Sequence, residues 1–177
     1  MTPINSHDIT IYSHIIPNNG GAVHWGTMLA DFIGRYLNKV DSKGRVSVPA
    51  AWRPRLTRED FSGIIAQTGI QEKAIDAYPR DYLEIIQTKL DQNDPLLEET
   101  EFESTILFGG TMLPFDKEGR INLPENYKQD AGIEIEALFV GMGRKFRIWD
   151  PKSFDQYLER ARSYMDNRRK KAEENVK

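Results

Sequence analysis

The chain contains no cysteine among its 177 residues, and it has only three histidines. Without cysteine, neither a disulfide nor a thiolate metal site can form, which fits a reducing cytoplasm. No apolar run approaches the roughly 20 residues that a membrane-spanning helix needs. The first residues also lack the basic start and continuous apolar core of a signal peptide. We therefore expect a soluble protein that is neither exported nor inserted into a membrane.

The histidines His7, His14 and His24 all lie within residues 1–30. Their spacing matches no compact metal motif, so we expect no metal and no cofactor. Because this stretch is polar and interrupted by a Pro-Asn-Asn-Gly-Gly run, it is predicted to be a flexible N-terminal extension. Met28 lies just ahead of the patterned region and is a hypothetical alternative start, which an intact native mass that includes the extension would refute.

A ten-residue unit occurs twice in the chain, at a constant offset of 75 positions. Val40–Pro49 reads VDSKGRVSVP, and Phe115–Pro124 reads FDKEGRINLP. Both copies place a carboxylate, two variable residues, a glycine and an arginine before an alternating strand that ends at proline. A unit written twice in one chain is typical of two similar substructures packed together. The sequence therefore predicts a duplicated module.

The residue types in each unit suit a strand, a tight turn and a second strand. The carboxylate of Asp41 can accept hydrogen bonds from the turn backbone, and Gly44 supplies the positive φ that such a turn needs. Arg45 either pairs with a carboxylate, that of Asp41 or Asp116, or points outward as a cation. The corresponding residues of the second unit are Asp116, Gly119 and Arg120.

The two units resemble those of the MraZ family, whose repeated Asp-x-x-Gly-Arg strands place it among the SpoVT/AbrB-like swapped-hairpin folds. The similarity begins near Asp31 and extends through Pro151. It implies an α+β fold in which two swapped-hairpin modules form a pseudo-two-fold β-barrel core. It also implies a ring-forming bacterial regulator of transcription that acts on the division and cell-wall gene cluster, including its own gene.

Apolar periodicity divides the rest of the chain. We assign the first repeat to 31–82, a helical connector to 83–110, the second repeat to 111–151, and a C-terminal helix with a basic tail to 152–177. Within these segments, apolar spacing predicts helices over 82–90 and 95–108 and a strand hairpin over 137–149. A short helix is expected over 49–56, with Pro54 restricting or ending it.

The final helix carries one apolar face and a basic end. Its apolar residues recur at helical spacing, and four basic residues follow at 168–171. We favour a packing or subunit-contact helix with a solvated tail over an arm that binds DNA.

Charge is distributed unevenly along a chain whose net charge is only −3. Between Arg35 and Arg58, seven basic residues stand against the single acidic residue Asp41. In the second module, residues 115–130 hold three basic and four acidic residues. A basic module on an acidic body concentrates positive potential on one face, which is the electrostatic footprint of a polyanion partner. The first module is therefore the better candidate for binding DNA.

Within that module, Lys43 and Arg45 are expected to meet phosphates or the acceptors of guanine in a major groove. Contacts that position the DNA backbone are expected from Arg35, Lys39, Arg53 and Arg55. For Arg45 a DNA role is preferred over the carboxylate pair, whereas for Arg120 the structural pair is preferred.

These features favour a sequence-specific regulator that binds double-stranded promoter DNA as a closed ring, in the cytoplasm and associated with the nucleoid. The alternative is a ring-shaped scaffold protein without sequence-specific DNA binding. An enzyme is not expected, because no spacing of Ser, His and acidic residues assembles a nucleophile, a metal centre or a phosphate loop.

Overall fold

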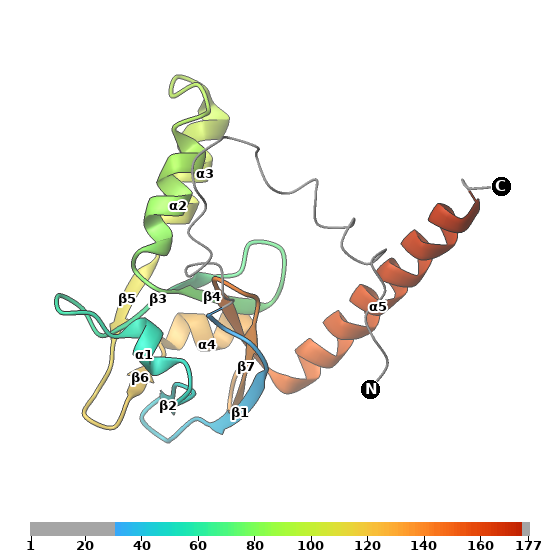
Figure 1. Ribbon diagram of the computed structural model, residues 1–177. Coiled ribbons are helices and arrows are strands. Elements are labelled where there is room, and N and C mark those ends of the chain that lie inside the picture. The colour runs from blue at the N-terminus through green and yellow to red at the C-terminus, as the bar shows by residue number, and fades with distance from the viewer. Residues whose placement is uncertain (1–30, 175–177) are drawn as a thin grey trace, which may run out of the picture.

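The computed structural model describes residues 31–174 and shows a mixed α+β fold (Figure 1). The strands are β1 Arg35–Lys39, β2 Arg45–Ser47, β3 Gly63–Thr68, β4 Ala74–Tyr78, β5 Thr111–Pro114, β6 Arg120–Asn122, β7 Glu136–Gly141 and β8 Phe146–Trp149. The helices are α1 Arg53–Leu56, α2 Tyr82–Leu90, α3 Glu98–Phe108, α4 Glu125–Ala131 and α5 Pro151–Glu174. The expected α+β class is confirmed. The predicted flexible extension over 1–30, with its histidines, lies outside the described residues.

Six strands form one antiparallel sheet in the order β1-β7-β8-β4-β3-β5. The central strand β4 is buried along its whole length, and β3 is buried at all but its last residue, whereas the edge strands β1 and β5 are mostly exposed. This difference follows the sequence, because β3 and β4 read as short apolar runs, which is typical of strands covered on both faces. The predicted hairpin of β7 and β8 is confirmed.

The strands β2 and β6 pair with each other and join the two ten-residue units. Val46 lies opposite Ile121, its counterpart 75 positions later in the sequence, and Arg45 lies opposite Asn122. Other pairings also cross between the repeats, since β1 of the first pairs with β7 of the second, and β5 of the second pairs with β3 of the first. Each repeat therefore completes its strand pairing with strands of the other.

Apolar residues of both repeats share one core. The alternating residues of the short strands and their flanks are almost completely buried: Val46, Val48, Ile121 and Leu123. Trp52 is also buried, and its ring lies against Phe32 and Phe146. Its counterpart in the second repeat is Tyr127, whose hydroxyl bonds to the Thr111 hydroxyl at 2.9 Å. Because these side chains interdigitate, the core stabilises both turns at once.

The helix expected over 49–56 is shorter than the sequence suggested. Residues 49–52 form a turn in which the Trp52 amide donates to the Pro49 carbonyl at 2.9 Å, and α1 begins only at Arg53. Pro54 lies in the first turn of α1, where its missing N–H needs no partner. The prediction that Pro54 ends the helix was wrong, because this proline belongs to the start of the helix.

The connector forms a helical hairpin of α2 and α3 (Figure 1). It lies at the end of the molecule opposite the turns over residues 41–44 and 116–119, which we call the first and second glycine turns. The predicted bounds of α2 are confirmed, and its Ile86 and Leu90 pack with Ile65 and Tyr78 of the sheet. Helix α3 begins at residue 98, three residues later than expected. In α3 only Thr100 is buried, so this helix is poorly covered.

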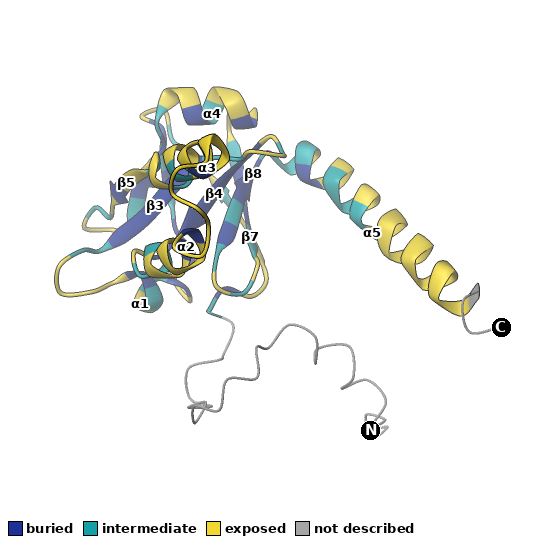
Figure 2. Cartoon of the chain, turned by 90° about the horizontal axis from the view of Figure 1, so that it is seen from above, coloured by how far each residue is buried: buried dark blue, intermediate teal, exposed yellow. Residues whose placement is uncertain are grey.

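Helix α5 starts on the sheet and then leaves the body of the protein (Figures 1 and 2). The carboxylate of Asp150 accepts the Ser153 amide at 2.9 Å, which satisfies a backbone donor at the helix start. Phe154 and Tyr157 then pack against Trp149. Among residues 31–174, no helix combines the length and apolar character that crossing a membrane requires.

Candidate functional site

The first glycine turn is closed by a network around Asp41. One carboxylate oxygen accepts the backbone amides of Lys43 and Arg45, each at 2.9 Å. The other oxygen accepts the Arg45 guanidinium, with Nε at 2.8 Å and Nη2 at 2.6 Å. These bonds, led by the side-chain bond from Arg45, lower the pKa of Asp41 to about 2. Gly44 has a φ of +78°, which favours glycine.

The second turn repeats this geometry around Asp116. Its carboxylate accepts the backbone amides of Glu118 and Arg120 at 2.9 Å and the Arg120 Nε at 2.7 Å. The bond from the Arg120 backbone is the main reason that the pKa of Asp116 is lowered. Gly119 has a φ of +73°. The Asp-x-x-Gly-Arg pattern therefore specifies one turn structure at both positions.

The two turns differ in what surrounds their arginines. Arg120 is held on two sides, because its Nη1 also lies 2.8 Å from the Glu118 carboxylate. At the position of Glu118 the first turn has Lys43, which is exposed and forms no ion pair within residues 31–174. Arg45 thus pairs with Asp41, the alternative that the sequence had placed second, and yet its turn keeps an excess of positive charge. Its side chain is 34% exposed.

Each turn also lies against a cation from the other repeat. A Cβ atom placed on Gly119 would lie 2.5 Å from the guanidinium carbon of Arg53, and one placed on Gly44 would lie 3.6 Å from Cε of Lys128. Arg53 and Lys128 are themselves 75 positions apart. Arg53, which was expected to contact the DNA backbone from the first module, lies at the second turn, and its Nε donates to the Val48 carbonyl at 2.8 Å.

Lys128 was missed by sequence reasoning, which counted charges along the chain. The signal that could have found it is the 75-residue offset from Arg53, combined with pairing of strands between repeats. Lys128 is 17% exposed and lies 2.7 Å from the carboxylate of Glu125, which in turn is 68% exposed. The cationic surface at the first turn consists of Lys43, Arg45 and Lys128, and we call it the first-turn cluster.

Comparison with known proteins identifies the family. A family profile described as "MraZ protein, putative antitoxin-like" matches residues 106–176. The chain is 44% identical over 131 residues to the transcriptional regulator MraZ of Rickettsia canadensis (strain McKiel), covering 73% of this chain and 88% of that one. The Rickettsia rickettsii (strain Sheila Smith) protein of the same name is 40% identical over 139 residues, covering 78% and 93%. The chain belongs to the MraZ family. The resemblance drawn from the two units is thereby confirmed.

In this member of the MraZ family, the remaining cations of the first module have different environments. Lys39 is exposed at the end of β1. Arg35, on the same strand, places its guanidinium 4.9 Å from the ring centre of Phe154, so it holds the start of α5 by a cation–π contact. Arg35 therefore contributes to packing of the final helix.

Two further arginines of the segment 35–58 are neutralised by acidic residues that lie outside it in the sequence. Arg55 donates to Asp31 at 2.7 Å and to Asp81 at 2.9 Å, and Arg58 also pairs with Asp81. The pairs with Asp81 and Asp31 raise the pKa of Arg55 against the opposing effect of burial. Arg55 thus has a structural position, and the local excess of positive charge is smaller than the sequence count implied.

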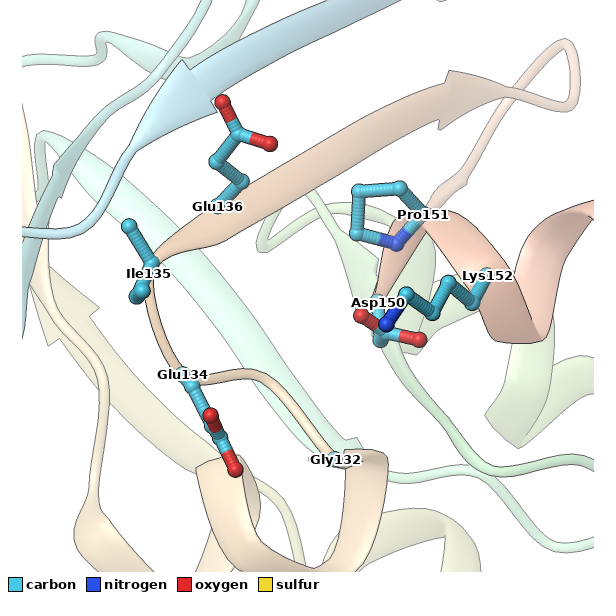
Figure 3. A pocket seen from close by; sticks show the side chains of 7 residues that line it. All are labelled: Gly132, Glu134, Ile135, Glu136, Asp150, Pro151 and Lys152. Atoms are coloured by element: carbon cyan, nitrogen blue, oxygen red, sulfur yellow. The ribbon is translucent and has the colours of Figure 1, made fainter.

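A shallow hollow near the start of α5 has the opposite charge (Figure 3). Three of its side chains are the carboxylates of Glu134, Glu136 and Asp150, and Lys152 is the only basic one. Asp150 is already engaged by Ser153 at the start of the helix. This hollow would repel a polyanion, which leaves the first-turn cluster as the better candidate site.

Proposed function

We propose that this protein is a sequence-specific DNA-binding regulator of transcription that acts as a closed ring. The observation that carries the proposal is the first-turn cluster, where Lys43, Arg45 and Lys128 meet at a surface turn. Cations on a turn of fixed geometry are suited to phosphates and to the acceptors of guanine. The relatives named transcriptional regulators support the same function.

We infer that the two repeats interleave as swapped hairpins about a pseudo-two-fold axis and enclose a barrel-like core. The symmetric pairing of β2 with β6 supports this arrangement, as does the order of the large sheet, in which β1, β7 and β8 mirror β5, β3 and β4. Such interleaving brings Lys128 of the second repeat to the turn of the first.

Within the cluster we assign different roles to Lys43 and Arg45. Lys43 is exposed and contacts phosphate. Asp41 orients the Arg45 guanidinium through Nε and Nη2, and Nη1 has no ion-pair partner within residues 31–174. Arg45 therefore presents Nη1 to a phosphate or a guanine oxygen. Lys39 extends the positive surface along β1.

A single small cluster binds weakly at physiological salt, because each phosphate contact is opposed by counterions. A ring would repeat the cluster around one surface and engage short repeats of promoter DNA at high effective concentration. Binding there would occlude transcription, and the expected target is the division and cell-wall gene cluster that includes the protein's own gene. The protein would then act in the cytoplasm, associated with the nucleoid.

Fluorescence anisotropy with DNA from upstream of the protein's own gene tests the proposal. A scrambled duplex of equal length is the control, and both are titrated over a salt series. We expect selective binding by the wild type. The variant Lys43→Ala should bind more weakly, with the salt slope reduced by about one per binding turn. Lys117→Ala, which removes an exposed lysine from the second turn, is the matched control and should bind as the wild type does.

Arg45→Ala and Arg120→Ala complete the design, each checked for an unchanged oligomer mass. Loss of selective binding in Arg45→Ala alone supports reading of DNA through the first turn. Equal binding to both duplexes, or no binding by an intact oligomer, would contradict the proposal and favour the scaffold alternative.

A further inference from the structure

The outer half of α5 has exposed apolar side chains and little contact with the body. Tyr164 is 66% exposed and Met165 is 59% exposed. Beyond Arg160, which pairs with Glu72, no hydrogen bond or ion pair joins this helix to the rest of residues 31–174. A helix of 24 residues is about 36 Å long. Such a projecting amphipathic helix is typical of a segment that packs against a partner.

The helical hairpin provides an apolar groove of about 780 Å³ between α2, α3 and the sheet. Ile70, Phe102 and Ile106 line the groove and are strongly exposed. The amide oxygen of Gln67 also lies at the groove, buried and without a hydrogen-bond partner within residues 31–174. A buried acceptor without a donor is costly, so the groove suits an occupant that brings an N–H or O–H group.

Helix α3, which forms one wall of the groove, and the outer half of α5 have opposite charge, although Lys89 and Lys145 also line the groove. Helix α3 carries four carboxylates and no basic residue. Residues 162–173 of α5 carry five basic side chains against two acidic ones. Arg168 and Arg169 follow Tyr164 and Met165 by one turn, so the apolar and basic residues share a face. On α3, Glu103 lines the groove beside Phe102, and Glu99 lies one turn before both.

The outer half of α5 cannot occupy the groove of its own chain. In both views α5 leaves the body on the side away from the α2–α3 hairpin (Figures 1 and 2). Helix α5 runs without a break from Pro151 to Glu174, so no hinge within it could return its end to the groove. A second copy of the chain is the occupant that carries the complementary apolar and basic face.

We propose that the outer half of α5 from one copy docks in the α2–α3 groove of the next copy. Tyr164 and Met165 then cover Phe102 and Ile106, the two arginines meet Glu99 and Glu103, and a donor from the incoming helix satisfies Gln67. The contact joins two different surfaces, so it is head-to-tail and closes into a ring when the rotation between copies permits. This inference rests on the proposed function, since it names the surfaces that join the subunits of the ring.

Two surface variants test the contact by light scattering coupled to size exclusion. The helix variant carries Met165→Asp and Arg168→Glu, and the groove variant carries Phe102→Asp and Ile106→Asp. All four side chains are exposed, so each variant should fold. We expect wild type at a multiple of the 20.4 kDa chain mass and each variant at the mass of one chain. The matched controls, Lys170→Glu and Glu101→Lys, reverse charges on the opposite helix faces and should assemble as the wild type does.

A mixture of the two variants tests the contact more directly than either variant alone. The intact groove of the helix variant and the intact helix of the groove variant can form one contact only. An equimolar mixture at about 100 μM should therefore reach twice the chain mass and no more. Wild-type mass in either variant, or a mixture that remains at the mass of one chain, would overturn the proposed contact.

The same mass measurements distinguish failure of this contact from failure of the proposed ring. Wild type that remains a single chain at every concentration would overturn the ring as well as the contact. Wild type that assembles while both variants also assemble would overturn the contact alone and leave the DNA-binding test unaffected.

Discussion

The turn at Asp41 and the turn at Asp116 have the same backbone bonds, with three equivalent carboxylate contacts that agree to about 0.1 Å. Their charges differ because Lys43 stands where the second turn has Glu118. One residue thus decides whether the arginine of the turn is enclosed by acids or lies beside a second cation. The comparison shows that the fixed residues of the pattern build the turn, and that a variable position sets its chemistry.

The largest difference between the repeats should arise in the core beneath the turns. Trp52→Ala removes a buried ring that contacts Phe32 and Phe146, and it should lower the free energy of unfolding by about 3–5 kcal/mol. Tyr127→Phe, at the equivalent position, removes only a hydroxyl and should cost about 1 kcal/mol. Urea denaturation at equal protein concentration measures both. Equal costs would contradict the expectation that the buried Trp52 ring contributes much more to stability than the Tyr127 hydroxyl does.

Glycine substitutions test whether the two turns are equally strained. Gly44→Ala and Gly119→Ala each force an L side chain into positive φ, at +78° and +73°, and each should destabilise the protein by about 1–2 kcal/mol. Gly119→Ala should cost more, because its Cβ would also lie 2.5 Å from the guanidinium carbon of Arg53. Thermal unfolding of the two variants under identical conditions provides the measurement. A Gly44→Ala protein that is as stable as the wild type, or less stable than the Gly119→Ala protein, would contradict this expectation.

Exchanging the variable residue tests the difference in chemistry directly. Lys43→Glu gives the first turn the acid of the second and should weaken binding to the upstream DNA by about tenfold or more at moderate salt. Glu118→Lys removes one of the two acids that hold Arg120 and should strengthen binding. Anisotropy titrations of both variants over a salt series measure the effect. An unchanged affinity in Lys43→Glu would place the DNA surface elsewhere.

The smallest expected effect is on the stability of the protein at acid pH. The pKa of Asp41 is about 2 in the folded chain against an ordinary value of 3.8, so its ionised form stabilises the fold above about pH 4. This contribution is lost as the pH falls from about 4 to about 2. The variant Asp41→Asn should therefore lose less stability than the wild type between pH 5 and pH 3, as measured by urea midpoints. Identical losses in the two proteins would show that Asp41 does not contribute.

Features that depend on nearby residues could be predicted from the sequence. The two turns follow from local chemistry, since Asp, Gly and Arg lie within five positions of one another. The bounds of α2 and the β7–β8 hairpin follow from apolar spacing in the same way. Pro54 was misread because the same residue ends a helix from its interior and starts one from its first turn.

Features that depend on distant residues could not be predicted. Lys128 reaches Gly44 only because strands pair between the repeats, and a count of charges along the chain cannot contain that pairing. Arg55 similarly pairs with Asp81 at a separation of 26 positions, and a count of charges within the first module could not include that pair. The sequence predicted a packing or subunit-contact helix at the end of the chain, and its subunit contact stays a prediction, whereas the groove beside α2 and α3 could be located only once their packing was known.

The exchange of cations between the repeats constrains how such a protein evolves. Because Lys128 lies at the turn of the first repeat and Arg53 at the turn of the second, a substitution in the helix of one half changes the charge beside the turn of the other. After duplication, the halves cannot diverge as independent modules. A change within one turn, such as Lys43 in place of Glu118, therefore acts beside a cation that the other half supplies, and a hybrid that joined unrelated halves would inherit a mismatched surface.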